Sequence, residues 1–132
     1  MSILVNIDVP ELDAAITFYT AAFDLNVSRR FGTDAVELSG WPTPVYILRK
    51  EAGTVGAAGQ LRTYGRHWTP VHLDVVVDDI DTAVRRAVNA GAQLEHAACP
   101  TPYGKIAMLA DPFGHGLCLI EFIGRGYDEI TS

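Results

Sequence analysis

The chain has 132 residues, of which 48% are hydrophobic and 20% charged, and its net charge is −6. This balance is typical of a globular protein and excludes disordered and collagen-like chains. The ten basic residues are scattered and form no stripe that could neutralise a phosphate backbone, so we expect no nucleic-acid partner. The sequence shows no signal-peptide pattern and no apolar run of about 20 residues, which predicts a cytoplasmic protein with no membrane partner.

The first half of the chain predicts one helix among four strands. Residues 3–9 alternate between an apolar and a mixed face, which indicates a strand. Acidic residues then lead into a helix over 12–23, whose apolar side chains recur at helical spacing. Three short alternating runs complete this half, at 25–31, 34–39 and 44–49.

The second half repeats the first at an offset of 68 residues, so that Val9 corresponds to Val77 and Asp13 to Asp81. The repeat predicts a strand at 71–77, a helix at 80–91, and strands at 93–98, 105–110 and 116–122. Asp111-Pro112-Phe113-Gly114, before the last strand, has the residue choices of a type I turn. Each half is therefore β-α-β-β-β, and neither is large enough to bury a sufficient core alone.

This duplicated pattern, with Asp-Pro-Phe-Gly-His before the final strand, resembles the vicinal oxygen chelate superfamily of glyoxalase I, bleomycin resistance proteins and extradiol dioxygenases. The resemblance covers residues 3–122 and implies an α+β fold, in which two tandem βαβββ modules form a curled mixed sheet around a cavity. One departure is Asp24, where the family usually has Gly; Asp is among the few other residues that tolerate a left-handed backbone. We expect a single domain over 1–132, comprising module one (1–50), a connector (51–70), module two (71–123) and a C-terminal tail (124–132).

The resemblance also implies a divalent metal, held in the enzymes by His or Gln from the first strand and Glu from the last strand of each module. The matching positions here carry Leu4 and Tyr46 in module one, and His72 and Cys118 in module two, so only His72 fits. Glu121 lies three residues beyond Cys118, and an odd step along a regular strand reverses the face unless a bulge intervenes. His72 and Glu121 are thus weak metal candidates. Because His72 with Cys118 supplies only two ligands, fewer than the three or four that zinc takes from a protein, we predict no metal and no other cofactor.

Two residues of module two combine reactivity with a position in the expected cavity. His72 is the candidate catalytic acid or base, with Asp74 on the same face to orient it. The alternative, weighed equally, is a half-buried histidine that Asp74 or a neighbouring strand satisfies. Cys118 could be a nucleophile or soft ligand, but core packing is the interpretation we favour.

Further binding candidates are polar or aromatic. Asn6 lies on the mixed face of the first strand, which lines the cavity if the two-module arrangement holds. Aromatic rings near the module edges could sandwich a planar ligand, or pack in the core or at a dimer seam. The predicted ligand-binding residues are Asn6, Trp41, Tyr46, Trp68, His72, Asp74, Tyr103 and Cys118.

These residues favour a metal-independent small-molecule binding protein, similar to the bleomycin resistance type, that encloses an aromatic or amphipathic ligand as a homodimer. The alternative is a glyoxalase-like lyase or isomerase, or an extradiol dioxygenase, with a degenerate or absent metal site. A third hypothesis is a module that docks another protein. The residues leave open whether the modules pair within one chain or exchange between two. They also leave open whether the connector, which carries Arg62, Tyr64, Arg66 and His67 among glycines, acts as a lid.

Overall fold

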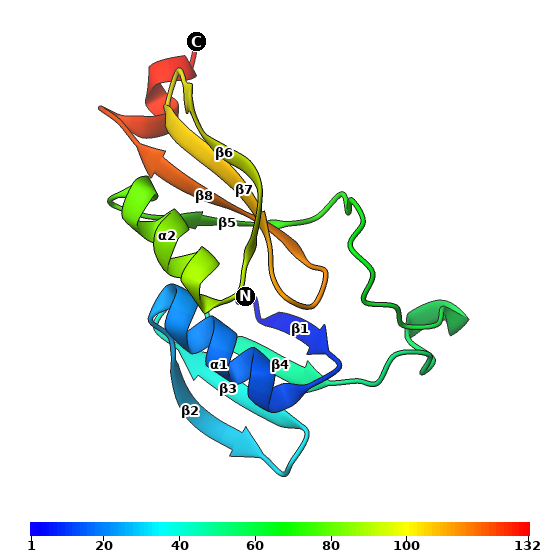
Figure 1. The fold of residues 1–132 in the computed structure, drawn as a ribbon. Helices are drawn as coiled ribbons and strands as arrows, with labels where there is room; N and C mark the ends of the chain where they lie inside the picture. The colour runs from blue at the N-terminus through cyan, green and yellow to red at the C-terminus, as the bar shows by residue number, and fades with distance from the viewer. The chain divides into compact units, whose positions relative to one another are not determined.

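A computed structural model describes all residues, 1–132, and divides them into two compact units, Met1–Gly65 and Arg66–Ser132. Each unit contains one βαβββ module with a four-stranded mixed sheet, which confirms the predicted α+β fold class (Figure 1). The boundary between the units falls inside the predicted connector, so residues 66–70 fold with the second unit.

The first unit builds its sheet in the order β1-β4-β3-β2, with β1 parallel to β4 and the other pairs antiparallel. Its elements are β1 (Val5–Val9), α1 (Leu12–Phe23), β2 (Asn26–Phe31), β3 (Ala35–Ser39) and β4 (Val45–Arg49). Helix α1 ends at Asp24, whose φ of 56° and ψ of 34° confirm the left-handed backbone expected there. A short 3-10 turn, η1 (Ala57–Gly59), follows in the connector.

The second unit repeats this topology, with the sheet order β5-β8-β7-β6 and β5 parallel to β8. Its elements are β5 (Leu73–Val76), α2 (Ile80–Ala90), β6 (Gln93–Thr101), β7 (Gly104–Ala110), β8 (Gly116–Phe122) and the 3-10 turn η2 (Gly126–Ile130). Strand β6 is three residues longer than expected and has two irregularities in its pairing with β7. Strands β1 and β5 begin two residues later than the alternation suggests, because their parallel partners start only at Val45 and Gly116.

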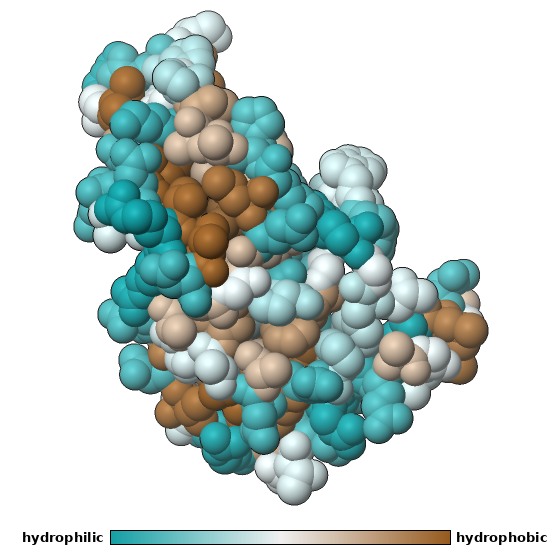
Figure 2. Space-filling view, in the orientation of Figure 1, coloured by the Kyte–Doolittle hydropathy of each residue, from teal (hydrophilic) through white to brown (hydrophobic).

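In each sheet, alternate side chains point to the helix and to the opposite side, which we call the open face. Val36, Leu38 and Ile47 are fully buried in the first unit, as are Leu119 and Ala107 in the second, and these form the cores beneath α1 and α2. The open face of the second sheet instead leaves apolar side chains uncovered. Val76 is 60% exposed and Met108 46%. Figure 2 shows apolar surface on both units, bordered by hydrophilic side chains.

The turn between β7 and β8 is held by the buried carboxylate of Asp111. Its Oδ1 accepts hydrogen bonds from the backbone N–H groups of Phe113 and His115 at 2.8 and 2.9 Å, and its Oδ2 lies 2.8 Å from His115 Nδ1. The Asp-Pro-Phe-Gly-His motif therefore closes on itself. This geometry brings β8 back beside β7 and fixes where Gly116 and Cys118 lie.

Residues 51–65 of the connector fold back on the first unit. Arg62 donates to the Asp8 carboxylate on β1 at 3.0 Å and to the Val55 carbonyl at 2.7 Å, and Val55 pairs with Leu61 in an isolated bridge. None of the helices combines the length and the apolar character that crossing a membrane requires.

Candidate functional site

A row of side chains crosses the open face of the second sheet. Asp74 on β5 pairs with Cys118 on β8, Cys118 with Met108 on β7, and Met108 with His96 on β6. Since directly paired residues place their side chains on the same face, the sheet register brings carboxylate, thiol and thioether groups together.

His72, Asp74 and Cys118 form a compact cluster at the β5 end of this row. Their ligand-type atoms all lie within 4.8 Å of one another, and His72 Nε2 is 3.1 Å from Asp74 Oδ1. With the Nε2 proton directed at Asp74, Nδ1 is the ring atom left to accept a proton from a ligand. The cluster therefore offers an oriented base beside a buried thiol.

The Cys118 thiol is held in its protonated form. Burial raises its pKa to about 11, and the nearby charge and hydrogen bonding of Asp74 act in the same direction. Because only a thiolate is strongly nucleophilic, Cys118 at neutral pH serves as an apolar wall and a weak hydrogen-bond donor.

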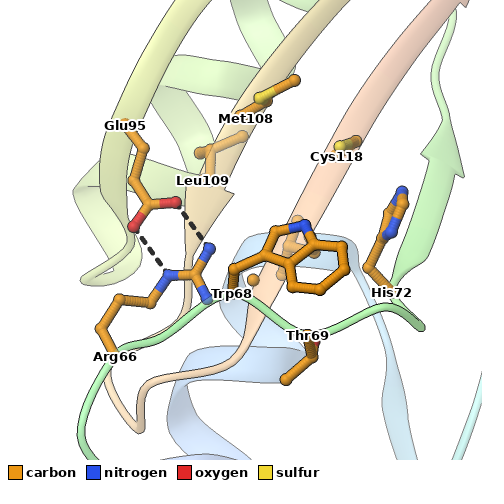
Figure 3. A pocket seen from close by; sticks show the side chains of 10 residues that line it. Arg66, Trp68, Thr69, His72, Glu95, Met108, Leu109 and Cys118 are labelled. Carbon is orange, nitrogen blue, oxygen red and sulfur yellow. Dashed lines mark hydrogen bonds and ion pairs between the residues drawn. The ribbon is translucent and has the colours of Figure 1, made fainter.

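A cavity of about 130 Å³ lies beside the cluster and opens to solvent (Figure 3). Its floor comes from β7 and β8, and the segment leading into β5 places Trp68 and His72 at its rim. The lining residues are Arg66, Trp68, Thr69, His72, Glu95, Met108, Leu109, Gly116, Leu117 and Cys118. For scale, an apolar cavity of roughly 150 Å³ holds a benzene ring.

Three aromatic rings gather at the other end of β8. Tyr127 of η2 packs on Tyr103 and Phe122, with ring centroids 4.9 and 4.8 Å apart. Phe122 lies two pleats beyond Cys118 and therefore shares its face. Burial and the charge of Asp74 raise the pKa of Tyr127, so its hydroxyl remains a donor at neutral pH.

The first unit carries an equivalent row on its open face. Asn6 pairs with Tyr46, Tyr46 with Glu37, and Glu37 with Arg29. The Glu37 carboxylate accepts from Tyr46 Oη at 2.6 Å and from Arg29 Nη2 at 2.6 Å and Nε at 3.0 Å. These bonds, with one from Ser28, lower its pKa to about 2. The result is a polar network in which the Glu37 carboxylate is ionised at neutral pH and accepts hydrogen bonds from three side chains.

The structure brings some of the sequence-predicted residues together and separates others. Trp68, His72, Asp74 and Cys118 share one site, and Tyr103 lies farther along the second unit. Asn6 and Tyr46 are neighbours in the first unit. Trp41 packs on Phe23 at the end of α1, with the ring centroids 5.4 Å apart.

In the first unit, the two positions that the resemblance matches to metal ligands carry Leu4 and Tyr46, neither of which is a good donor to a metal ion. Leu4 has no donor atom, and the hydrogen bond to Glu37 raises the pKa of the Tyr46 phenol and keeps it protonated. Glu121 Oε2 accepts from the Ile80 backbone N–H at the start of α2, 2.9 Å away, which directs this carboxylate to the helix side.

The cluster in the second unit contains three potential metal ligands. Asp74 joins His72 and Cys118, because β5 places Asp74 directly beside Cys118. Imidazole, carboxylate and thiolate suit zinc better than magnesium or calcium, and three protein ligands with one open position is a common catalytic zinc arrangement. These residues fit a zinc-like ion by chemistry, although not the family's own ligand pattern.

Several lining residues had no signal in the sequence. Glu95, Met108 and Gly116 lie on three different strands and meet only through the sheet register. Glu37 and Arg29 are eight positions apart and pair only because β2 and β3 are neighbours. Only a correct prediction of the strand order and register would have identified the three lining residues and the Glu37–Arg29 pair.

Comparisons with known proteins agree on the fold. Residues 4–120 match the glyoxalase-like domain family. The chain is 35% identical to the anthracycline biosynthesis protein DauV of Streptomyces sp. (strain C5) over 117 residues, covering 84% of this chain and 38% of DauV. It thus spans about two fifths of the length of that relative.

Two further similarities cover nearly the whole of both chains. The uncharacterized protein Mb0911c of Mycobacterium bovis is 30% identical over 133 residues, covering 94% of this chain and 86% of its own. The fosfomycin resistance protein FosX of Listeria monocytogenes superposes with a TM-score of 0.73 at 13% identity, covering 99% of this chain and 98% of FosX. At that identity the likeness to FosX is one of fold.

Proposed function

We propose that this chain, which belongs to the glyoxalase-like domain family, is a metal-independent small-molecule binding protein. The cavity of its second unit would enclose the ring of an aromatic or amphipathic ligand. The observation that carries this proposal is the cavity beside Trp68, where the apolar side chains of Met108, Leu109 and Leu117 are bordered by polar groups at the rim. Its role would be sequestration or transport of the ligand, as in bleomycin resistance proteins.

The size and lining of the cavity support a ring-sized group as the part of the ligand that enters. A volume of about 130 Å³ admits a single ring, while the open side leaves room for the rest of a larger molecule. Leu117 and Met108 offer apolar surface, and burying such surface contributes roughly 25 cal/mol per Å². His72 supplies a polar contact that would orient the ligand.

The electrostatics support binding in preference to covalent chemistry. The raised pKa of Cys118 keeps it a thiol, and the Glu37 carboxylate is fully engaged by Arg29 and Tyr46. Neither group is free to act as a nucleophile or a base. Sequestration requires only affinity, which the aromatic and aliphatic walls provide.

The relative DauV is an anthracycline biosynthesis protein, and this suggests a first probe. Anthracyclines are flat, fluorescent aromatic molecules, so doxorubicin can be titrated with the whole chain and its fluorescence followed. We expect saturable binding that Trp68→Ala weakens at least about tenfold, since a tryptophan wall commonly contributes that much affinity. Val55→Ala, an exposed change in the connector, is the control. Failure of planar aromatic compounds to bind, or equal affinity of the Trp68→Ala variant, would contradict the proposal.

The cluster supports a second candidate, a metal-dependent lyase, isomerase or dioxygenase. His72, Asp74 and Cys118 would hold the ion, which when bound would act as a Lewis acid on a substrate oxygen. The chain's own part in this case is to orient the substrate against Trp68 and to exclude water over the apolar floor.

Elemental analysis of protein purified without chelator separates the two candidates. The first proposal expects no stoichiometric ion. One zinc-like ion per chain that is lost in both His72→Ala and Cys118→Ser would contradict the first proposal and support the second. Cobalt substitution adds a direct readout, because a thiolate ligand gives a charge-transfer band that Cys118→Ser removes.

A further inference from the structure

A segment that we call the strap, residues 66–72, bridges the two edges of the second sheet. The sheet order β5-β8-β7-β6 places β5 and β6 at opposite edges. Arg66 is paired with Glu95 on β6, and the strap ends at His72, which contacts Asp74 on β5. The strap therefore crosses the sheet, and the cavity lies between it and β7 and β8 (Figure 3).

The Arg66 end of the strap is held by two parallel hydrogen bonds to Glu95. Arg66 Nε lies 2.7 Å from Glu95 Oε2 and Nη2 lies 2.8 Å from Oε1, a bidentate geometry that fixes the plane of the guanidinium. Nη1 also donates to the carbonyl of His67 within the strap. Arg66 thus ties the backbone next to Trp68 to the far edge of the sheet.

Gly116 makes room for this pairing. A Cβ at position 116 would lie 2.5 Å from Arg66 Nη2 and 2.9 Å from its Cζ, which is closer than real side chains approach. The guanidinium therefore occupies space that only glycine leaves free. A larger residue at position 116 requires the Arg66 guanidinium to shift, which disturbs its bidentate geometry with Glu95.

Trp68 is the residue whose position depends on this arrangement. Its side chain lines the cavity, yet Trp68 is 78% exposed, so few contacts of its own hold the indole in place. Thr69 Oγ1 donates to the Val71 carbonyl at 2.9 Å and stiffens the strap locally. The direction of the ring is then set by where the strap is anchored.

We infer that Arg66, Glu95 and Gly116 are positioning residues that hold Trp68 over the cavity, and that Trp68 is the specificity-determining wall against which a planar, ring-sized group of the ligand stacks. This inference rests on the proposed function for its ligand, but its structural part stands independently. The Arg66–Glu95 pair is partly exposed, and such pairs contribute little to stability. Its loss should therefore alter Trp68 more than it alters folding.

The test uses a Trp41→Phe background, in which Trp68 is the single tryptophan. Acrylamide quenching and fluorescence anisotropy report its mobility without any ligand. We expect Glu95→Gln and Gly116→Ala each to lower the anisotropy, while the quenching constant of this 78% exposed ring rises only slightly and the unfolding midpoint of Glu95→Gln stays close to that of the background. Asp34→Asn, which removes the charge of the carboxylate paired with Arg49 in the first unit, is the control and should change neither signal.

Doxorubicin titration of the same variants supplies the second measurement. At least fivefold weaker binding by Glu95→Gln, with Asp34→Asn unchanged, supports the assignment of positioning residues. Unchanged anisotropy in both Glu95→Gln and Gly116→Ala would overturn it, as would altered Trp68 mobility with unchanged doxorubicin affinity. If the background protein binds no planar aromatic compound, the proposed function and the role of Trp68 in specificity fail, while the anisotropy data still decide whether the pair positions Trp68.

Discussion

Asp74 connects the two reactive side chains of the candidate site. Its carboxylate contacts His72 Nε2 and also raises the pKa of the Cys118 thiol. One residue thus orients an imidazole and keeps the neighbouring thiol protonated.

Replacing the Asp74 carboxylate should lower the pKa of the Cys118 thiol. In Asp74→Asn the negative charge that opposes thiolate formation is gone, so the pKa of Cys118 should fall from about 11 toward the ordinary value near 8.5, although burial, the larger cause, keeps it above that value. Iodoacetamide alkylation in a Cys99→Ser background should be several-fold faster at pH 9. Asp81→Asn on α2 is the control, and a pH profile identical to that of the parent would contradict the prediction.

Glu37 should make stability depend on pH in the acid range. Hydrogen bonds from Arg29, Tyr46 and Ser28 lower its pKa from 4.5 to about 2 in the folded chain. A lowered folded-state pKa contributes stability above the unfolded value, and this stability is lost as pH falls from about 4.5 through 2. Urea unfolding at pH 6, 4 and 2.5 should therefore show a smaller loss toward acid in Glu37→Gln than in the wild type. Glu11→Gln, whose side chain makes no helix-capping bond, should retain the wild-type slope.

At the scale of single elements, helix α1 ends at a non-glycine residue, Asp24, whose backbone is in the left-handed region. Asp24 adopts φ 56° there, a conformation that costs L-residues roughly 1–2 kcal/mol. We expect Asp24→Gly to be more stable than Asp24→Ala by about 1 kcal/mol, since both remove the side chain and only alanine retains the strain. Thermal or urea unfolding of the pair measures this difference. Equal stability would indicate that the helix end rearranges.

Strand β7 begins at a glycine, Gly104, because another residue there would collide with β8. A Cβ at Gly104 would lie 1.9 Å from the Glu121 carbonyl oxygen, so alanine has to push β7 away from β8. Gly104→Ala should destabilise by about 3 kcal/mol from overpacking and backbone strain together. Gly53→Ala, also at positive φ but with no atom within 4 Å of the added Cβ, should cost far less. A similar loss of unfolding free energy in the two variants would show that β7 and β8 can move apart at little energetic cost.

For the whole molecule, we predict a homodimer. Each unit has about half of the 132 residues, a size at which a single core buries too little surface, and Val76 and Met108 remain exposed on an open sheet face. Sedimentation velocity at micromolar concentration should give twice the 14.3 kDa chain mass. A single-chain mass under these conditions would contradict this.

The sequence predicted the order and type of the elements because these follow from local patterns. Alternation identified the strands, helical spacing identified α1 and α2, and the repeat of Val9 at Val77 related the two halves. The candidate site was predicted only in part. His72 was identified through its family position, whereas Asp74 gained a role as a third donor only once it lay beside Cys118.

What the sequence by itself determined is the duplicated βαβββ architecture and its membership of the glyoxalase-like family. What only the tertiary structure decided is which side chains meet: Arg66 with Glu95, Asp74 with Cys118, and Trp68 with the cavity. The physical reason is that periodicity acts over a few residues, while strand register is set by hydrogen bonds between distant segments, and a shift of one residue would turn each side chain to the other face.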